Sequence, residues 1–243
     1  MPTTPRELLI AQAMRDLVDR DDANPLDLLR DLVTHVVALL PVQAAGATVM
    51  GITGEPDHLA ASDEKSRRLE RAQFDLGEGP SLDSAHSGRA LPLVLLRHNS
   101  TSPRWPRFAP LALRDGINAV AAVPLRTRDH SYGALSLMNT ASPVPRPHDI
   151  RLAQSLATTA AASLRLQRAM HEKDSVISHL QTALDSRIVI EQAKGVLAER
   201  LHASTDEAFV HLRSHARNQS RKLHDLASEI VRRNDAAEPD TAT

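Results

Sequence analysis

The most informative absence in the sequence is cysteine, of which the 243 residues contain none. Without a thiol, the chain has no disulfide framework, thiolate nucleophile, iron–sulfur cluster or thiol redox switch. Aromatic residues are also scarce, with three phenylalanines, one tryptophan and one tyrosine. This composition argues against the class of proteins that read RNA by stacking bases on an aromatic sheet. An RNA-binding surface on this chain must therefore use arginine, lysine, amide side chains and the backbone.

An excess of one charge and long apolar runs are missing as well. The formal net charge is −1 at pH 7, so no field of the whole protein draws it onto nucleic acid or membrane. No cationic stretch followed by an apolar one opens the sequence. No apolar run approaches the roughly 20 residues that a membrane span needs. We therefore expect a cytoplasmic protein without a membrane partner, long enough for one large domain or two modest ones.

The C-terminal stretch 180–233 shows three apolar periodicities whose spacings of three and four residues indicate amphipathic helices. The first break ends in a capping box, in which Ser204 and Glu207 each satisfy a backbone N–H. Ser220 is expected to be the N-cap of the third helix. Short connections and one apolar face per helix predict a three-helix bundle. The apolar positions are Leu184, Ile188 or Val189, Ala193, Val196 or Leu197, then Ala208, Phe209, Leu212 and Ala216, then Leu223, Leu226, Ala227 and Ile230.

One face of the first of these helices is a candidate binding surface. Arg187 and Lys194 share it and could contact RNA phosphates or loop bases, with Glu191 orienting them. The alternative is an ordinary solvated ion-pair face. Gly195 lies inside the helix, where glycine costs about 1 kcal/mol relative to alanine. Either close helix–helix packing or close approach of RNA explains it.

A second candidate surface lies around the break between the second and third helices. Arg213 and Arg217 are one helical turn apart, and Arg221 and Lys222 follow at the start of the next helix. Phosphate binding by these residues should weaken as salt rises. Charge at helix ends is also common for capping reasons, which is the alternative explanation.

The sequence offers little for catalysis or metal binding. His211 and His215 have the spacing of a metal-ligand pair, but no third ligand has a matching spacing, so we expect a solvated pair and no metal. No nucleophile elbow, phosphate loop or kinase signature is present. We therefore expect neither an enzyme nor a bound cofactor.

The N-terminal two thirds of the chain mixes helices and strands. Asn24-Pro25 predicts a helix start, with Asn24 as the N-cap and Pro25 in the first turn. The polar link 126–130 joins two apolar strands into a hairpin. The sequence predicts an α+β layout, an antiparallel sheet with helices to one side. The predicted helices are 6–20, 24–40, 62–73 and 104–115, the strands 44–53, 58–61, 90–96, 119–125 and 132–138, and 76–82 is a Gly/Pro turn.

A long helix is expected between the two regions, because neither glycine nor proline occurs between His148 and Gly195. Its later apolar positions step by 4, 7, 3, 4 and 4 residues, close to a heptad seam. We favour a parallel coiled-coil homodimer, because a lone solvated helix would expose the whole stripe. The alternative is packing of the stripe onto the sheet of the same chain. The stripe consists of Leu166, Met170, Ile177, Leu180, Leu184 and Ile188.

The C-terminal helices resemble an ANTAR domain, the RNA-binding module of bacterial transcription antiterminators. The resemblance covers about a quarter of the chain without gaps. It implies binding to hairpins in nascent mRNA, by two bundles of a dimer on two neighbouring hairpins. The matching segments are Ser186-Arg187, Gln192-Ala193-Lys194-Gly195, Asp206-Glu207-Ala208-Phe209, Leu212-Arg213 and Arg221-Lys222-Leu223.

The region 24–168 resembles a GAF domain of the subtype that precedes ANTAR modules in actinobacterial proteins. This implies a sensor for a small-molecule or protein signal. Such domains commonly have cysteine where this chain has Ser81, so a covalent bilin or thiol response is excluded. The glycines before Ser81 are explained either by a structural turn or by ligand contact. The segments that carry the resemblance are Pro41-Val42, Ala45-Gly46-Ala47-Thr48, Ala60-Ala61-Ser62-Asp63, Gln73, Gly77-Glu78-Gly79-Pro80-Ser81, Trp105-Pro106-Arg107-Phe108, Val123-Pro124-Leu125 and Gly133-Ala134-Leu135.

Together these observations predict an RNA-binding transcriptional antiterminator that senses a signal through a GAF domain and binds mRNA hairpins through an ANTAR domain. The alternatives are a DNA-binding regulator, since three small helices also describe a helix-turn-helix, and a dimeric sensor or scaffold without RNA binding. The expected divisions are an N-terminal helix 1–23, a GAF-like domain 24–168, a coiled-coil linker 169–185, an ANTAR bundle 186–233 and a disordered tail 234–243.

Overall fold

The computed structural model describes residues 5–19, 24–51, 54–97, 104–140 and 144–235. The chain forms two compact units, Met1–Arg168 and Ala169–Thr243, which we describe separately. Most of the predicted disordered tail, residues 236–243, lies outside the described residues. Among the residues described, no helix has the length and apolar character to cross a bilayer.

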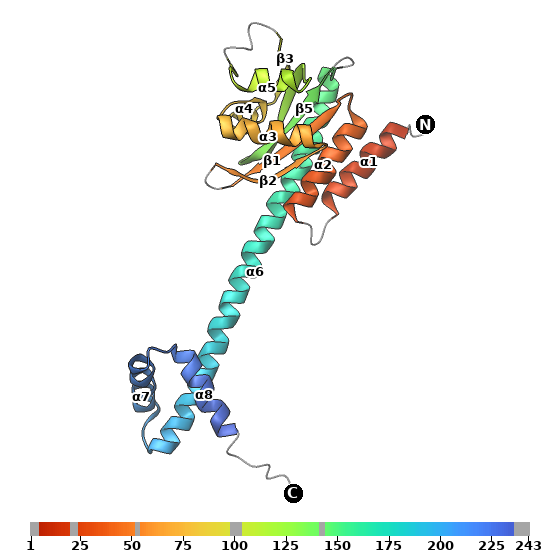
Figure 1. Cartoon of the computed structure of the whole chain (residues 1–243). Coiled ribbons are helices and arrows are strands. Elements are labelled where there is room, and N and C mark those ends of the chain that lie inside the picture. The colour runs from red at the N-terminus through yellow and green to blue at the C-terminus, as the bar shows by residue number, and fades with distance from the viewer. Residues whose placement is uncertain (1–4, 20–23, 52–53, 98–103, 141–143, 236–243) are drawn as a thin grey trace. The chain divides into compact units, whose positions relative to one another are not determined.

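The first unit is built on a five-stranded antiparallel sheet (Figure 1). Its strand order is β2-β1-β5-β4-β3, and β4 and β5 form the hairpin that the sequence predicts. The α+β class with an antiparallel sheet is therefore confirmed. The strands are β1 (Ala44–Met50), β2 (Pro56–Ala61), β3 (Leu91–Leu95), β4 (Ala119–Arg126) and β5 (Ser131–Asn139).

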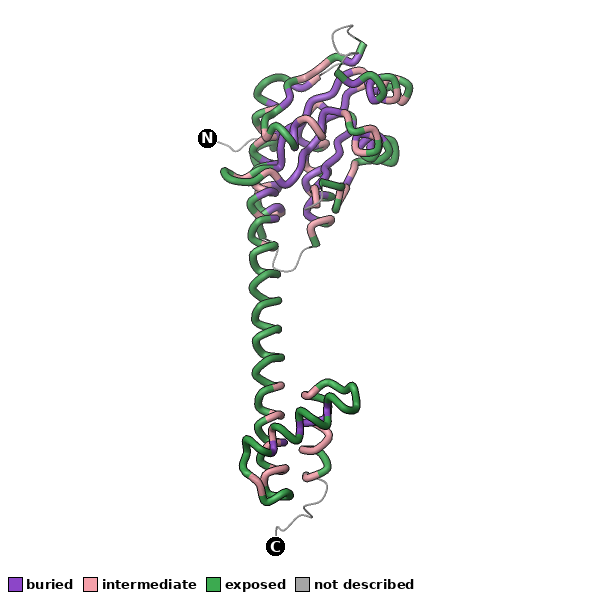
Figure 2. Tube along the Cα trace, turned by 90° about the vertical axis from the view of Figure 1, so that its left-hand side faces the viewer, coloured by how far each residue is buried: buried purple, intermediate pink, exposed green. Residues whose placement is uncertain are grey.

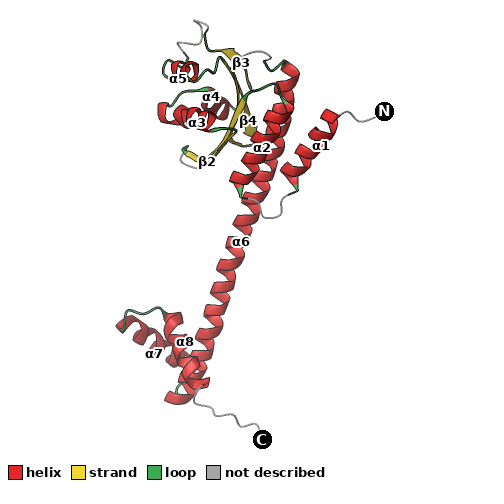
Figure 3. Cartoon of the chain, turned by 45° about the vertical axis from the view of Figure 1, so that its right-hand side comes forward, coloured by secondary structure: helices red, strands yellow, loops and turns green. Residues whose placement is uncertain are grey.

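Helices cover both faces of this sheet, which corrects the expectation of helices on one side only (Figure 3). Alternate residues of β1 face opposite ways: Ala45 and Ala47 enter one core and Ala44 the other. Because β1, β4 and β5 are buried on both faces, each needs an apolar layer on either side. One layer is α1 (Pro5–Val18), α2 (Pro25–Leu39) and the first part of α6 (Pro147–Leu201), and the other is α3 (Glu64–Leu76), α4 (Pro80–Ser87) and α5 (Phe108–Arg114).

The helical layer of α1, α2 and α6 forms the larger core. Asn24 caps α2 as predicted, since its side-chain oxygen accepts the N–H of Leu26 at 3.0 Å and Pro25 opens the helix. Helix α1 belongs to this unit, because its buried Ala13 and Leu17 join the same core. Small residues on α6 allow its backbone to lie close to the sheet. Its buried residues here are Ala153, Leu156, Ala157, Ala160, Ala161 and Leu164.

The Gly/Pro segment predicted as a turn over 76–82 is shorter in the structure, because α4 begins at Pro80. Gly77 has φ 67° and ends α3 in the left-handed conformation. Gly79 has φ 149°, and a Cβ at this position would overlap the side chain of Gln73. Glu78 accepts the backbone N–H of Phe108 at 2.7 Å at the start of α5. Gly77, Glu78 and Gly79 therefore each have a structural role.

A buried carboxyl group, Glu70 of α3, lies between this segment and the sheet. Its oxygens accept hydrogen bonds from four side chains, those of Thr48 on β1, Gln73 on α3, Ser81 on α4 and Ser136 on β5. Gly46 on β1 leaves room for it, because a Cβ there would overlap Glu70 Cγ. The sequence does not reveal this cluster, because the many charged residues of α3 indicate a surface helix. The hydroxyl of Ser81 donates to this carboxyl group.

Burial raises the pKa of Glu70, because the charged form loses solvation; the four hydrogen bonds oppose this shift. A folded-state pKa above the unfolded one means that the folded chain binds the additional proton. The contribution of the protonated group to stability is complete at pH values below the unfolded pKa. It is lost as the pH rises through the folded pKa.

We predict that Glu70→Gln flattens this dependence. In chemical unfolding of the full chain from pH 4 to 8, the wild-type free energy of unfolding should fall relative to that of Glu70→Gln as the pH rises. Other titrating groups cancel in the difference between the two proteins. Glu64→Gln, at the exposed start of the same helix, is the control and should follow the wild type. Parallel curves for wild type and Glu70→Gln would contradict the prediction.

Candidate nucleic-acid interface

The second unit ends in a bundle of the last part of α6, α7 (Thr205–Asn218) and α8 (Leu223–Asp235). All three helices contribute to one core, which is buried inside the bundle (Figure 2). Alanines at three of its five buried positions let the helices approach closely. The bundle therefore matches the predicted three helices. The buried residues are Ala193, Leu212, Ala216, Leu226 and Ala227.

The connections of the bundle are fixed by helix caps. Ser204 and Glu207 form the predicted capping box, with the Glu207 carboxylate 2.9 Å from the Ser204 N–H. These hydrogen bonds from Ser204 lower the pKa of Glu207, because they favour its charged form. The prediction of Ser220 as the N-cap of α8 is wrong. Ser220 has φ 52° and follows the end of α7, where its N–H donates to the carbonyl of Arg217.

The side chain of Lys194 lies along the surface of the bundle, where it contacts neighbouring side chains. Its side chain is only 15% exposed, and its ammonium group lies 2.8 Å from the Glu191 carboxylate. The same ammonium group lies 5.5 Å from the centre of the Phe209 ring on α7. The predicted pairing with Glu191 is therefore present. Lys194 thus contacts Glu191 on its own helix and Phe209 on α7.

Arg187 and Gly195 flank Lys194 on α6, and both are exposed. A Cβ placed on Gly195 would meet no atom within 4 Å. Close packing of helices within the bundle therefore does not require glycine at this position. Open space also means that another molecule can approach the α6 backbone here.

Arg213 and Arg217 continue this surface onto α7. They follow Phe209 at intervals of four residues, so all three lie along one face of the helix. Because Phe209 contacts Lys194, this row of α7 faces the same side as the Lys194 surface of α6. Both arginines are exposed. We call the surface of Arg187, Lys194, Gly195, Arg213 and Arg217 the basic face.

Arg221 lies on a different side of the bundle. Its guanidinium group donates to Glu229 of α8 at 2.8 Å, and Arg233 lies 2.6 Å from the same carboxylate. Both arginines lower the pKa of Glu229, the Arg221 hydrogen bond most strongly. Lys222, the residue before α8, is exposed. The seven predicted residues thus form one basic face of five, with Arg221 apart from it and Lys222 at the turn.

Comparison with protein-family models identifies both regions. A GAF domain model matches residues 22–165, and an ANTAR domain model matches residues 178–231. No curated protein matches the chain in a sequence search.

Solved structures of low sequence identity share the fold of the first unit. The GAF domain of a phosphoenolpyruvate-protein phosphotransferase from Coxiella burnetii is 16% identical, with a TM-score of 0.52 over 71% of this chain and 99% of that one. The corresponding domain from Acinetobacter is 15% identical, with a TM-score of 0.50 over 68% and 96%. Bacteriophytochrome RpBphP3 from R. palustris is 11% identical, with a TM-score of 0.52 over 84% and 45%.

Proposed function

The chain belongs to the GAF-domain family and carries an ANTAR domain at its C-terminal end, and on this premise we propose that it is an RNA-binding transcriptional antiterminator. A small-molecule or protein signal at the GAF domain alters the presentation of the ANTAR bundle. The bundle binds hairpins in nascent mRNA in the cytoplasm and prevents terminator structures from forming. The protein acts by binding, and we propose no catalytic step.

The observation that supports RNA binding best is the basic face together with the open space at Gly195. A helix interior normally favours alanine over glycine by about 1 kcal/mol, and no contact within the bundle explains the glycine. A surface without a side chain lets a sugar–phosphate backbone approach the helix closely. Arg187 and Lys194 on the same helix, and Arg213 on α7, supply positive charge.

The dimer is the second part of the proposal. Every residue from 169 to 185, the predicted linker, is exposed in the single chain (Figure 2). The six residues of the heptad-like stripe are between 51% and 59% exposed. An unpaired stripe of this kind is unfavourable in water, because six large apolar side chains stay solvated. A second copy of the same helix buries them in a parallel coiled coil.

We predict that the wild-type chain selects hairpins from an RNA pool with a constant stem and a randomised loop, and binds them in preference to duplex DNA. Arg217→Ala and Lys194→Met should weaken binding and make its salt dependence shallower, by about 0.7–0.9 of a log–log unit per lost phosphate contact. Methionine keeps an apolar side chain over Phe209 while it removes the charge.

The control for this titration is Arg128→Ala, which removes one exposed positive charge from the GAF domain. It should bind RNA as the wild type does. Preference for duplex DNA would favour a DNA-binding regulator. Failure to bind either nucleic acid would contradict the proposal and leave a dimeric sensor or scaffold.

We also predict that Ile177→Glu/Leu184→Glu converts a dimer into a monomer, because four carboxylates cannot be buried in the seam. Sedimentation equilibrium of the full chain measures the molecular mass directly. Ser175→Glu/Thr182→Glu is the control, since it places the same number of carboxylates at exposed positions off the seam. A monomeric wild type, or a double variant that remains dimeric, would rule out the seam.

A further inference from the structure

A groove of about 460 Å³ opens in the C-terminal bundle, between α7 and α8 and over the end of α6. Its floor is apolar and consists of Leu197, Leu212, Leu226 and Ile230. One wall carries two imidazoles, those of His211 and His215, which are one helical turn apart and exposed. The groove lies on the opposite side of α7 from the row of Phe209, Arg213 and Arg217. The basic face therefore does not include it.

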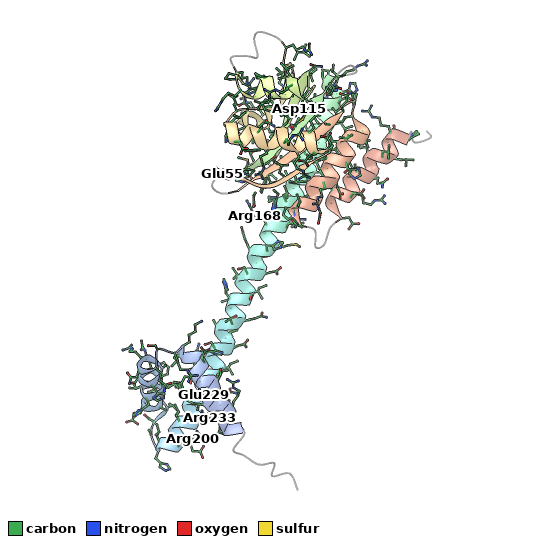
Figure 4. The ribbon with its side chains drawn as sticks, viewed as in Figure 1. Glu55, Asp115, Arg168, Arg200, Glu229 and Arg233 are labelled. Atoms are coloured by element: carbon green, nitrogen blue, oxygen red, sulfur yellow. The ribbon has the colours of Figure 1, made fainter. Side chains whose placement is uncertain are left out.

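Polar side chains close the rim of the groove. Gln219 continues the histidine row of α7, and its amide nitrogen lies 3.0 Å from His215 Nε2. On the other side, the Glu229 carboxylate pairs with both Arg221 and Arg233. Figure 4 labels Glu229 and Arg233, which both lie on α8. The hydrogen bond from Arg221 to Glu229 uses one of the five N–H donors of the guanidinium group. The Arg221 guanidinium is thus oriented at the mouth and retains donors for a further anion.

We propose that this groove receives one unpaired base of the RNA, which stacks on the imidazoles of His211 and His215 while Arg221 binds an adjacent phosphate. This inference rests on the proposed RNA-binding function and adds a second site to the basic face. The basic face contacts the backbone, whereas the groove holds a base.

The chemistry of the groove fits this occupant. Unpaired loop bases can be splayed out of a hairpin and stacked on aromatic side chains, histidine included. The volume lies in the range of about 300–1,000 Å³ that is typical of pockets for small ligands. An apolar floor accepts the face of a base, and an amide and a carboxylate at the rim can accept or donate at its edge. The charged side chains that line the groove are two arginines and one carboxylate, and their net positive charge favours a phosphate-bearing ligand.

The test is a double-mutant cycle between protein and RNA, made with a hairpin recovered from the pool described above. Each loop nucleotide is replaced in turn by an abasic one, and binding to wild type and His215→Ala is measured. We expect one loop position at which loss of the base weakens wild-type binding by about 5- to 150-fold. At that position the abasic change should have no further effect on His215→Ala.

Two further variants separate stacking from other effects. His224→Ala removes an exposed imidazole from α8 outside the groove and should retain the full effect of the abasic change. His215→Phe keeps a planar ring and should restore sensitivity to the loop base. Thermal unfolding of each variant, followed by circular dichroism, should match the wild type because His215 is exposed.

The inference would be overturned if the effects of His215→Ala and of the abasic change were additive at every loop position. It would also be overturned if His215→Ala bound RNA like His224→Ala. In both cases the proposed function stands. Either outcome would leave the groove to a protein segment. If the wild type recovers no hairpin from the pool, the proposed function and this inference fail together.

Discussion

The structure depends on one continuous helix, α6, whose 55 residues must satisfy three different surroundings. Its first part is rich in buried alanine and leucine and completes the core of the GAF domain. Its middle part exposes an apolar stripe, and its last part supplies Ala193 to the bundle core. Because a helix satisfies its own backbone hydrogen bonds, only the side chains distinguish these parts. The unburied stripe is the constraint that makes a second copy of the chain the expected partner.

The carboxyl group of Glu70 is buried in the GAF domain, at a position where a packed core usually has an apolar side chain. Glu70 accepts hydrogen bonds from β1, β5, α3 and α4, so the positions of two strands and two helices are linked through one carboxyl group. Loss of one partner would leave the others with an incompletely satisfied buried group, which is unfavourable. The segment around Gly77 and Glu78 reinforces this arrangement, because it joins α3, α4 and α5 by backbone geometry and capping.

Features that follow from local rules could be predicted from the sequence, and features that depend on tertiary context could not. The Asn24 cap, the capping box at Ser204 and the central hairpin are set by neighbouring residues, and the structure contains each of them. The start of helix α4 could not be predicted, because Pro80 follows two glycines and indicates a turn. Proline is also favoured in the first turn of a helix, and α4 begins at this residue. Glu70 lies among charged residues that face solvent, and only folding shows that α3 turns this one inward.

The candidate site divides in the same way. The sequence shows that basic residues are frequent in the C-terminal helices. Only the geometry of α7 shows which of them share the basic face, and that Arg221 instead pairs with Glu229. In the function that we propose, a dimer presents two such bundles to two neighbouring hairpins. The most direct test compares the affinities of the full chain for one hairpin and for two hairpins joined by a spacer. We expect the wild type to bind the tandem RNA at least about 10²-fold more tightly than the single hairpin, because the second contact gains from effective concentration. We expect Ile177→Glu/Leu184→Glu to lose this advantage. Equal affinities of the wild type for single and tandem hairpins at every spacer length would contradict this proposal.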